Sequence, residues 1–136
     1  MLKEIKIRRV QQEDEEGCGI ACVAMLTGST YKQMKRYFAE NIFINQKKVH
    51  TRNYQIRNAL SRHGIHTSNK VFREWRKINS SAIVPISRRR DGGWHWVLFI
   101  YDPEKSYVID PHYGRTNNKY YFRGLRAKGF YISLDH

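Results

Sequence analysis

The fold is decided by residues 12–26, which read QEDEEGCGIACVAML. Beyond Gly17 this stretch has almost no polar side chain, and a helix that is apolar on all sides is normally buried on all sides. We therefore expect a central buried helix over residues 17–26, ended by Gly28. The acidic run 13–16 lies just before this helix. Its carboxylates either favour the positive end of the helix dipole or line the approach to Cys18.

Helices fill the rest of the N-terminal half. Thr30 and Gln33 match a capping box, which predicts a second helix over about residues 30–40. Apolar residues at helical spacing, followed by a glycine, predict a third over about 53–63. A short, weaker helix is expected over about 70–78.

The C-terminal half changes to β-branched and aromatic residues, which favour strands. Strands are expected at 82–86, 94–101 and 106–110, with 120–122 and 130–134 able to close the sheet and 5–10 forming a leading strand or extended arm. Pro85 requires an edge position or a bulge, because proline cannot donate a ladder hydrogen bond. Helices first and strands last indicate an α+β fold in which the central helix packs on an antiparallel sheet. The 136 residues suit one domain, 1–136.

The composition is that of a basic globular protein. Twenty-five Lys and Arg against twelve Asp and Glu give a net charge of +13, which points to an acidic protein, a nucleic acid or an anionic membrane surface as partner. Because the basic residues are dispersed, nucleic acid is not expected to be the main partner. No stretch approaches the ~20 apolar residues of a membrane span, and the N-terminus lacks a signal-peptide core. Two cysteines four residues apart favour free thiols in a reducing compartment, so a cytoplasmic location is expected.

Three residues form a candidate nucleophilic set. Cys18 opens the buried helix, where orphan backbone N–H groups and the helix dipole favour a thiolate. His95 would deprotonate the thiol and protonate a leaving amine, while Asp110 would orient the imidazole. Gln12 and the backbone N–H of Cys18 would hold the developing oxyanion.

The spacing of the hairpin tests this set. A turn centred between Asp102 and Glu104 places His95 opposite a residue between about 110 and 112. Asp110 is therefore expected within reach of His95, whereas a slip of one residue would turn the two side chains to opposite faces.

Other residues are candidates for substrate binding. Trp94 and Trp96 flank His95, and we expect one to pack in the core and the other to wall the cleft. The arginine run precedes the same strand and would clamp acidic groups of a substrate or partner; it comprises Arg88, Arg89 and Arg90.

We expect no metal ion and no cofactor. Two cysteines and two histidines superficially suggest zinc, but neither pair has finger spacing; they are Cys18, Cys22, His63 and His66. No Gly-rich phosphate-binding motif or nucleotide signature is present. Cys22 is expected to pack in the core.

Three motifs occur together and in order: Gln12-x5-Cys18-Gly19-Ile20-Ala21-Cys22, then Trp94-His95-Trp96-Val97-Leu98, then Val108-Ile109-Asp110-Pro111 with Gly114-Arg115. With these motifs the chain resembles the bacteriocin-processing, double-glycine-leader peptidases of the papain-like superfamily. The resemblance extends from about Val10 to Tyr131. The resemblance implies a papain-like fold, a cysteine peptidase using Cys18, His95, Asp110 and Gln12, and cleavage after a Gly-Gly type leader. It also implies association with a separate transporter or partner protein.

One departure from the family pattern is that Gly17 stands where members often carry aspartate. Two other functions remain open for the same residues. The chain could be a deamidase or transferase that uses the same thiol chemistry. Alternatively, it is a basic, non-catalytic module that binds an acidic protein or nucleic acid. A binding module would tolerate Cys18→Ala, whereas an enzyme would not.

Overall fold

The computed structural model describes residues 7–87, 93–112 and 119–135. Three helices come first in the chain: α1 (Cys18–Thr27), α2 (Tyr31–Asn41) and α3 (Asn53–Arg62). The strands follow as β1 (Thr67–Val71), β2 (Ala82–Ser87), β3 (Trp94–Ile100), β4 (Tyr107–Ile109) and β5 (Phe130–Leu134), with 3₁₀ turns at Trp75–Lys77 and Phe122–Gly124. This arrangement confirms the predicted α+β fold.

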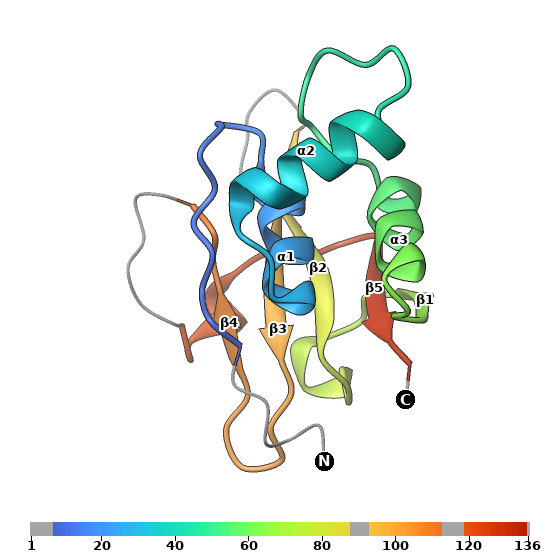
Figure 1. Cartoon of the computed structure of the whole chain (residues 1–136). Coiled ribbons are helices and arrows are strands. Elements are labelled where there is room, and N and C mark those ends of the chain that lie inside the picture. Colours follow the sequence, from blue (N-terminus) through green and yellow to red (C-terminus); the bar gives the residue numbers. More distant parts are fainter. Residues whose placement is uncertain (1–6, 88–92, 113–118, 136) are drawn as a thin grey trace.

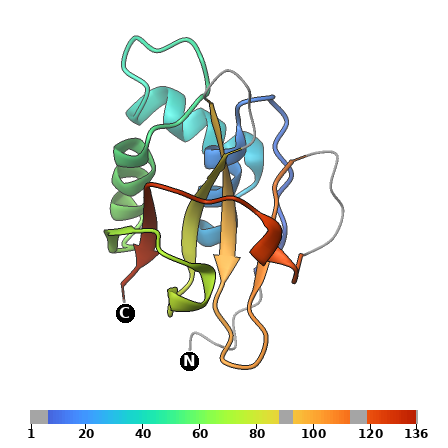
Figure 2. The ribbon, with the colours of Figure 1, turned by 180° about the vertical axis from the view of Figure 1, so that it is seen from behind.

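The five strands form one antiparallel sheet in the order β1-β5-β2-β3-β4. The helices cover one face of the sheet, with α1 lying over β2 and β3 (Figure 1). On the other face, residues 119–129, which lead into β5, cross over the strands (Figure 2). The sheet therefore separates two layers, and α1 is enclosed between the sheet and the other helices.

The core is divided in the same way, because alternate strand residues point to opposite faces of a sheet. On the helix side, the apolar residues of α1 pack with Trp96, Leu98 and Ile109. On the other side, Trp75 packs with alternate residues of β2 and β3. Every residue of α1 from Cys18 to Ala24 is buried, which confirms the prediction of a central helix buried all round.

The predicted helix ends are also confirmed. In α2 the hydroxyl of Thr30 accepts the Gln33 backbone N–H at 3.1 Å, and the Gln33 side chain accepts the Thr30 N–H at 2.9 Å. Gly28 follows α1 with φ 73°, a left-handed conformation that favours glycine.

Some predicted elements were wrong. Residues 70–78 form no α-helix, because the chain there continues β1 to Val71 and then makes a 3₁₀ turn at Trp75–Lys77. β1 itself was missed; it is a polar edge strand whose last three residues are exposed, so it lacks the apolar alternation of a half-buried strand. Residues 120–122 form no strand either: only Lys119 bridges to Val108.

Pro85 lies in β2, which is not an edge strand. Its neighbour β5 pairs with β2 only at Ala82 and Ile83, so Pro85 lies beyond the end of that pairing and a missing N–H costs no ladder bond there. At the N-terminus, residues 1–6 lie outside the described part, and residues 7–10 form no regular strand. Instead, this arm runs beside β4 and Pro111, where the Gln12 N–H donates to the Pro111 carbonyl at 2.8 Å (Figure 1).

Across residues 7–87, 93–112 and 119–135, the helices are too short or too polar for any of them to cross a bilayer.

Candidate active site

Cys18 is the first residue of α1, and its thiol lies against the start of β3. The N-cap is Gly17, which supplies no side-chain cap, so the orphan N–H groups of the first turn stay available to an anion. The backbone N–H of Trp96 donates to the Cys18 Sγ at 3.3 Å. A helix N-terminus and a directed N–H donor both favour a sulfur carrying negative charge.

His95 lies at the start of β3 and is hydrogen-bonded to the carboxylate of Asp110. Its Nε2 is 2.6 Å from the Asp110 Oδ1. In the β3–β4 register Leu98 pairs with Ile109; continuing it by three residues sets His95 opposite residue 112, with Asp110 diagonal to it. The predicted proximity is therefore confirmed. Because Nε2 is engaged with Asp110, Nδ1 is the ring nitrogen available to the thiol.

The neighbours of His95 favour its protonated form. Burial alone would lower the pKa of the imidazole, but the hydrogen bonds to Asp110 and Cys18, with the negative charges of both, raise it from 6.5 to about 9. An imidazolium at neutral pH beside a sulfur at a helix N-terminus can form an ion pair with a thiolate, and it can deliver a proton to a leaving group.

Asp110 is itself held by the N-terminal arm. Its Oδ1 also accepts the backbone N–H of His112 at 2.9 Å. Arg9 donates through Nε to the Asp110 carbonyl at 2.9 Å and through Nη2 to the His112 carbonyl at 2.6 Å. Sequence reasoning did not identify Arg9, because this contact joins residues about a hundred positions apart and carries no local signal.

Gln12 is completely buried and lies in the segment leading to α1. Its Nε2 donates to the backbone carbonyls of Asp14 at 2.9 Å and Glu15 at 2.8 Å. Both amide hydrogens are thus directed at the chain, while Oε1 has no hydrogen-bond partner among the described residues. The role of Gln12 in holding an oxyanion stays a prediction, and it requires that one of these two bonds be exchanged for the substrate.

A small cavity of about 140 Å³ opens beside the thiol. Its lining contains Cys18, His95 and Trp94, with Glu15 and Glu16 on another side. The acidic run was interpreted either as favouring the helix dipole or as lining the approach to Cys18. The second interpretation is the one that holds for Glu15 and Glu16. The same lining includes His50, whose ring lies 4.8 Å from that of Trp94, and which the sequence did not single out.

The two tryptophans divide as expected. Trp96 is 2% exposed, and its indole N–H donates to the Thr51 carbonyl at 3.1 Å, so its side chain belongs to the core. Trp94 is only half-buried and borders both the catalytic cavity and a larger neighbouring hollow. Arg88, Arg89 and Arg90 lie outside the described residues, so their predicted clamp stays a prediction.

The glycine before the nucleophile is explained by its packing. A Cβ on Gly17 would lie 1.9 Å from the hydroxyl oxygen of Tyr31. That hydroxyl donates to the Asp14 Oδ2 at 2.7 Å, so Tyr31 occupies the space that a side chain at position 17 would need. Glycine in place of the family's usual aspartate at position 17 therefore makes room for the Tyr31 side chain. Cys18 remains the first residue of α1.

The second thiol lies on the buried side of α1. Cys22 is fully buried and unpaired, and burial, followed by the charges of Cys18 and Asp110, raises the pKa of its thiol well above the usual value. It therefore stays a neutral core side chain. No cluster of three or more His, Cys, Asp or Glu able to hold a metal occurs in the described part of the chain.

Comparisons with known proteins identify the family and the fold of the chain. The model of the Peptidase C39 family matches residues 6–121. Among solved structures, a double-glycine-motif protease from an AMS/PCAT transporter, crystallised with the leader peptide, is similar with a TM-score of 0.64 at 15% identity over 95% of this chain and 91% of that chain. No curated protein matches the chain significantly.

Two further structures have the same fold. The peptidase domain of Streptococcus ComA, described as a bifunctional ABC transporter involved in quorum sensing, gives a TM-score of 0.66 at 18% identity over 95% of this chain and 98% of that one. The peptidase domain of Streptococcus mutans ComA gives 0.58 at 15% identity over 97% and 100%. Since the family model covers most of the chain, the resemblance seen in the sequence is confirmed: the chain belongs to the Peptidase C39 family and is a cysteine peptidase.

Proposed function

We propose that this peptidase removes leader peptides by hydrolysing the bond after a Gly-Gly pair, with Cys18 as nucleophile, His95 as acid and base, and Asp110 as the orienting carboxylate. The observation that carries the proposal is the 2.6 Å bond between His95 and Asp110 beside the thiol of Cys18 in one small cavity. The relative crystallised with a leader peptide supports the substrate class.

The reaction proceeds in two steps. The Cys18 thiolate attacks the scissile carbonyl carbon, and the oxyanion is held by N–H groups at the start of α1 and by Gln12 after its amide turns to the substrate. The carbonyl re-forms as the C–N bond breaks, and His95 gives its proton to the leaving amine. Water, deprotonated by His95, then hydrolyses the thioester and returns the thiol.

The same proposal includes a cytoplasmic location and association with a transporter, because the related peptidases are parts of transporters. Because the chain has a net charge of +13, the proposal also includes a substrate or partner that carries acidic residues.

A pair of synthetic peptides tests the proposed specificity. One carries Gly-Gly before the scissile bond and the other carries Gly-Val; mass spectrometry follows cleavage. We expect cleavage after Gly-Gly and a kcat/KM lower by about 10- to 200-fold for Gly-Val, the range set by one misfitting apolar group. Equal cleavage of both peptides would contradict the leader specificity. Release of ammonia without chain cleavage would instead identify a deamidase.

A further inference from the structure

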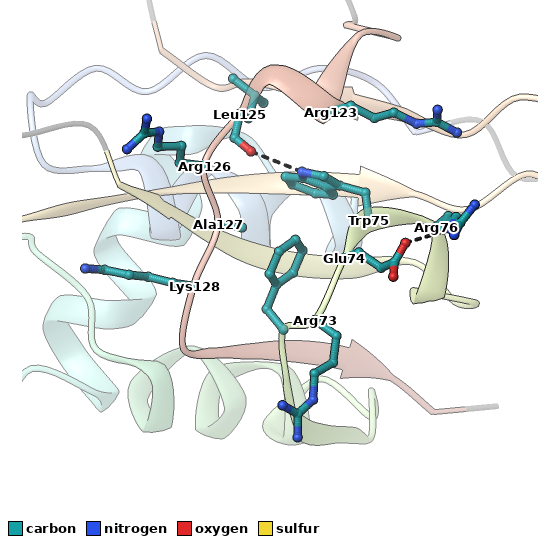
Figure 3. A pocket seen from close by; sticks show the side chains of 10 residues that line it. Arg73, Glu74, Trp75, Arg76, Arg123, Leu125, Arg126, Ala127 and Lys128 are labelled. Carbon is teal, nitrogen blue, oxygen red and sulfur yellow. Dashed lines mark hydrogen bonds and ion pairs between the residues drawn. The ribbon is translucent and has the colours of Figure 1, made fainter.

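Another hollow, also larger than the catalytic cavity, lies on the face of the sheet opposite α1. Its volume is about 580 Å³. It opens between the chain around the 3₁₀ turn after β1 and the segment before β5 (Figure 3). We call it the basic groove and define it by its lining residues, which are Phe72, Arg73, Glu74, Trp75, Arg76, Arg123, Leu125, Arg126, Ala127 and Lys128.

The charges around the basic groove are strongly one-sided. Five of its ten lining residues are Arg or Lys and one is acidic. That one, Glu74, is already paired with Arg76 at 2.6 Å. Within the described residues, no carboxylate forms an ion pair with the remaining four cations, which are Arg73, Arg123, Arg126 and Lys128. All four are exposed, so the rim presents uncompensated positive charge to a ligand.

The floor of the groove is apolar and fixed. Trp75 is 5% exposed, and its indole N–H donates to the Leu125 carbonyl at 3.1 Å across the groove (Figure 3). Phe72 and Leu125 are only partly buried, so they offer apolar surface to a ligand. An apolar floor inside a charged rim is the composition of a protein-binding surface.

Trp75 provides no stacking surface for the bases of a single-stranded nucleic acid. Trp75 packs against other rings, with centroids 5.2 Å from Phe72, 5.8 Å from Phe99 and 5.3 Å from Phe122. Base stacking requires a free aromatic face, and Trp75 offers none. In the part of the chain that the structure describes, the groove also lacks the long apolar helix face that a peripheral protein buries in a membrane interface.

The basic groove and the catalytic thiol lie on opposite faces of the sheet. The catalytic thiol belongs to the core on the helix side of the sheet, whereas Trp75 belongs to the core on the opposite side. From these observations we propose that the basic groove binds an acidic peptide segment of a second protein, which places an apolar side chain on Phe72 and Leu125 and carboxylates on the arginines of the rim. This docking is independent of the proposed cleavage.

Binding of a fluorescein-labelled peptide of about twelve residues, built from Glu, Asp and Leu, tests the proposal by fluorescence anisotropy. Reversing two rim charges with Arg73→Glu and Arg126→Glu is expected to weaken binding at least about tenfold, because two attractive pairs become repulsive. The matched control, Lys32→Glu with Lys47→Glu, makes the same change of net charge at exposed positions outside the groove and should bind nearly as the wild type does. Arg73→Gln with Arg126→Gln serves as a milder pair, and thermal melts establish that each variant is folded.

Equal weakening by the groove and control pairs would overturn the proposal, since binding would then follow net charge alone. Failure of the wild type to bind the peptide would also overturn it, as would tighter, groove-dependent binding of an oligonucleotide of equal charge or of anionic vesicles.

At a saturating concentration, the acidic peptide should leave the hydrolysis of a separate substrate unchanged. Competitive inhibition would show that the groove belongs to the substrate path. Because binding is measured without cleavage, the Cys18→Ala variant should bind the peptide as tightly as the wild type, whatever its activity.

Discussion

Replacing Cys18 with alanine is expected to abolish peptide hydrolysis, lowering kcat by about 10⁶-fold, as loss of a covalent nucleophile does in other hydrolases. The reason is that the reaction depends on the sulfur held between the N-terminus of α1 and the Trp96 N–H. The change removes a single atom and should leave the fold intact. Cleavage of a Gly-Gly leader peptide, followed by mass spectrometry, measures the effect.

Cys22→Ala is the matched control, because it removes the same atom from the same helix one turn further on. Cys22 is buried in the core and neutral, so its loss should cost about 1 kcal/mol of unfolding free energy and leave kcat/KM near the wild-type value. Retained activity in Cys18→Ala, with loss in Cys22→Ala, would reverse the assignment of the nucleophile.

Asp110→Ala should have the second-largest effect. It removes the carboxylate that fixes the tautomer and orientation of His95 at 2.6 Å, and we expect kcat/KM to fall by roughly 10²- to 10⁴-fold, the range for a positioned general acid or base. Asp110→Asn keeps an oxygen that can accept the Nε2 proton, so it should retain more activity than Asp110→Ala. Equal losses in the two variants would show that charge, and not orientation, is what Asp110 contributes.

The pH dependence of the activity follows from the raised pKa of His95. The pKa of His95 is raised from 6.5 to about 9, so the protonated ring that serves as acid is present below about pH 9. The wild-type kcat/KM should therefore fall as the pH rises through about 9, and in Asp110→Ala this fall should begin at lower pH.

The same raised pKa affects stability. Protonated His95 contributes to the free energy of unfolding, and this contribution is complete below about pH 6.5 and lost as the pH rises through about 9. Urea denaturation at several pH values measures it.

The sequence predicted the site better than it predicted the edges of the fold. Cys18 and the hairpin carrying His95 lie in segments with strong patterns: an apolar run for α1, and a β-rich run, turn and return strand for β3 and β4. In such segments local preference and tertiary packing agree. The hairpin spacing alone was enough to place Asp110 beside His95.

The errors fall where tertiary contacts decide the structure. β1 is a strand because it pairs with β5 along its whole length, although its Thr-Ser-Asn-Lys-Val sequence has weak strand preference. The hydrogen bonds of Arg9 join residues about a hundred positions apart, and Tyr31 of α2 packs over Gly17, which precedes α1. Neither produces periodicity or spacing that a single sequence reveals.

The alkylation rate of Cys18 by iodoacetamide as a function of pH, in the wild type and in His95→Ala, tests the central claim most directly. Peptide mapping separates Cys18 from Cys22. The account predicts fast reaction of wild-type Cys18 below about pH 7, where a free thiol is largely protonated, and loss of this low-pH reactivity in His95→Ala. If wild-type Cys18 reacts only at the pH of an ordinary thiol, or if His95→Ala leaves the profile unchanged, no thiolate–imidazolium pair exists and the catalytic assignment is wrong.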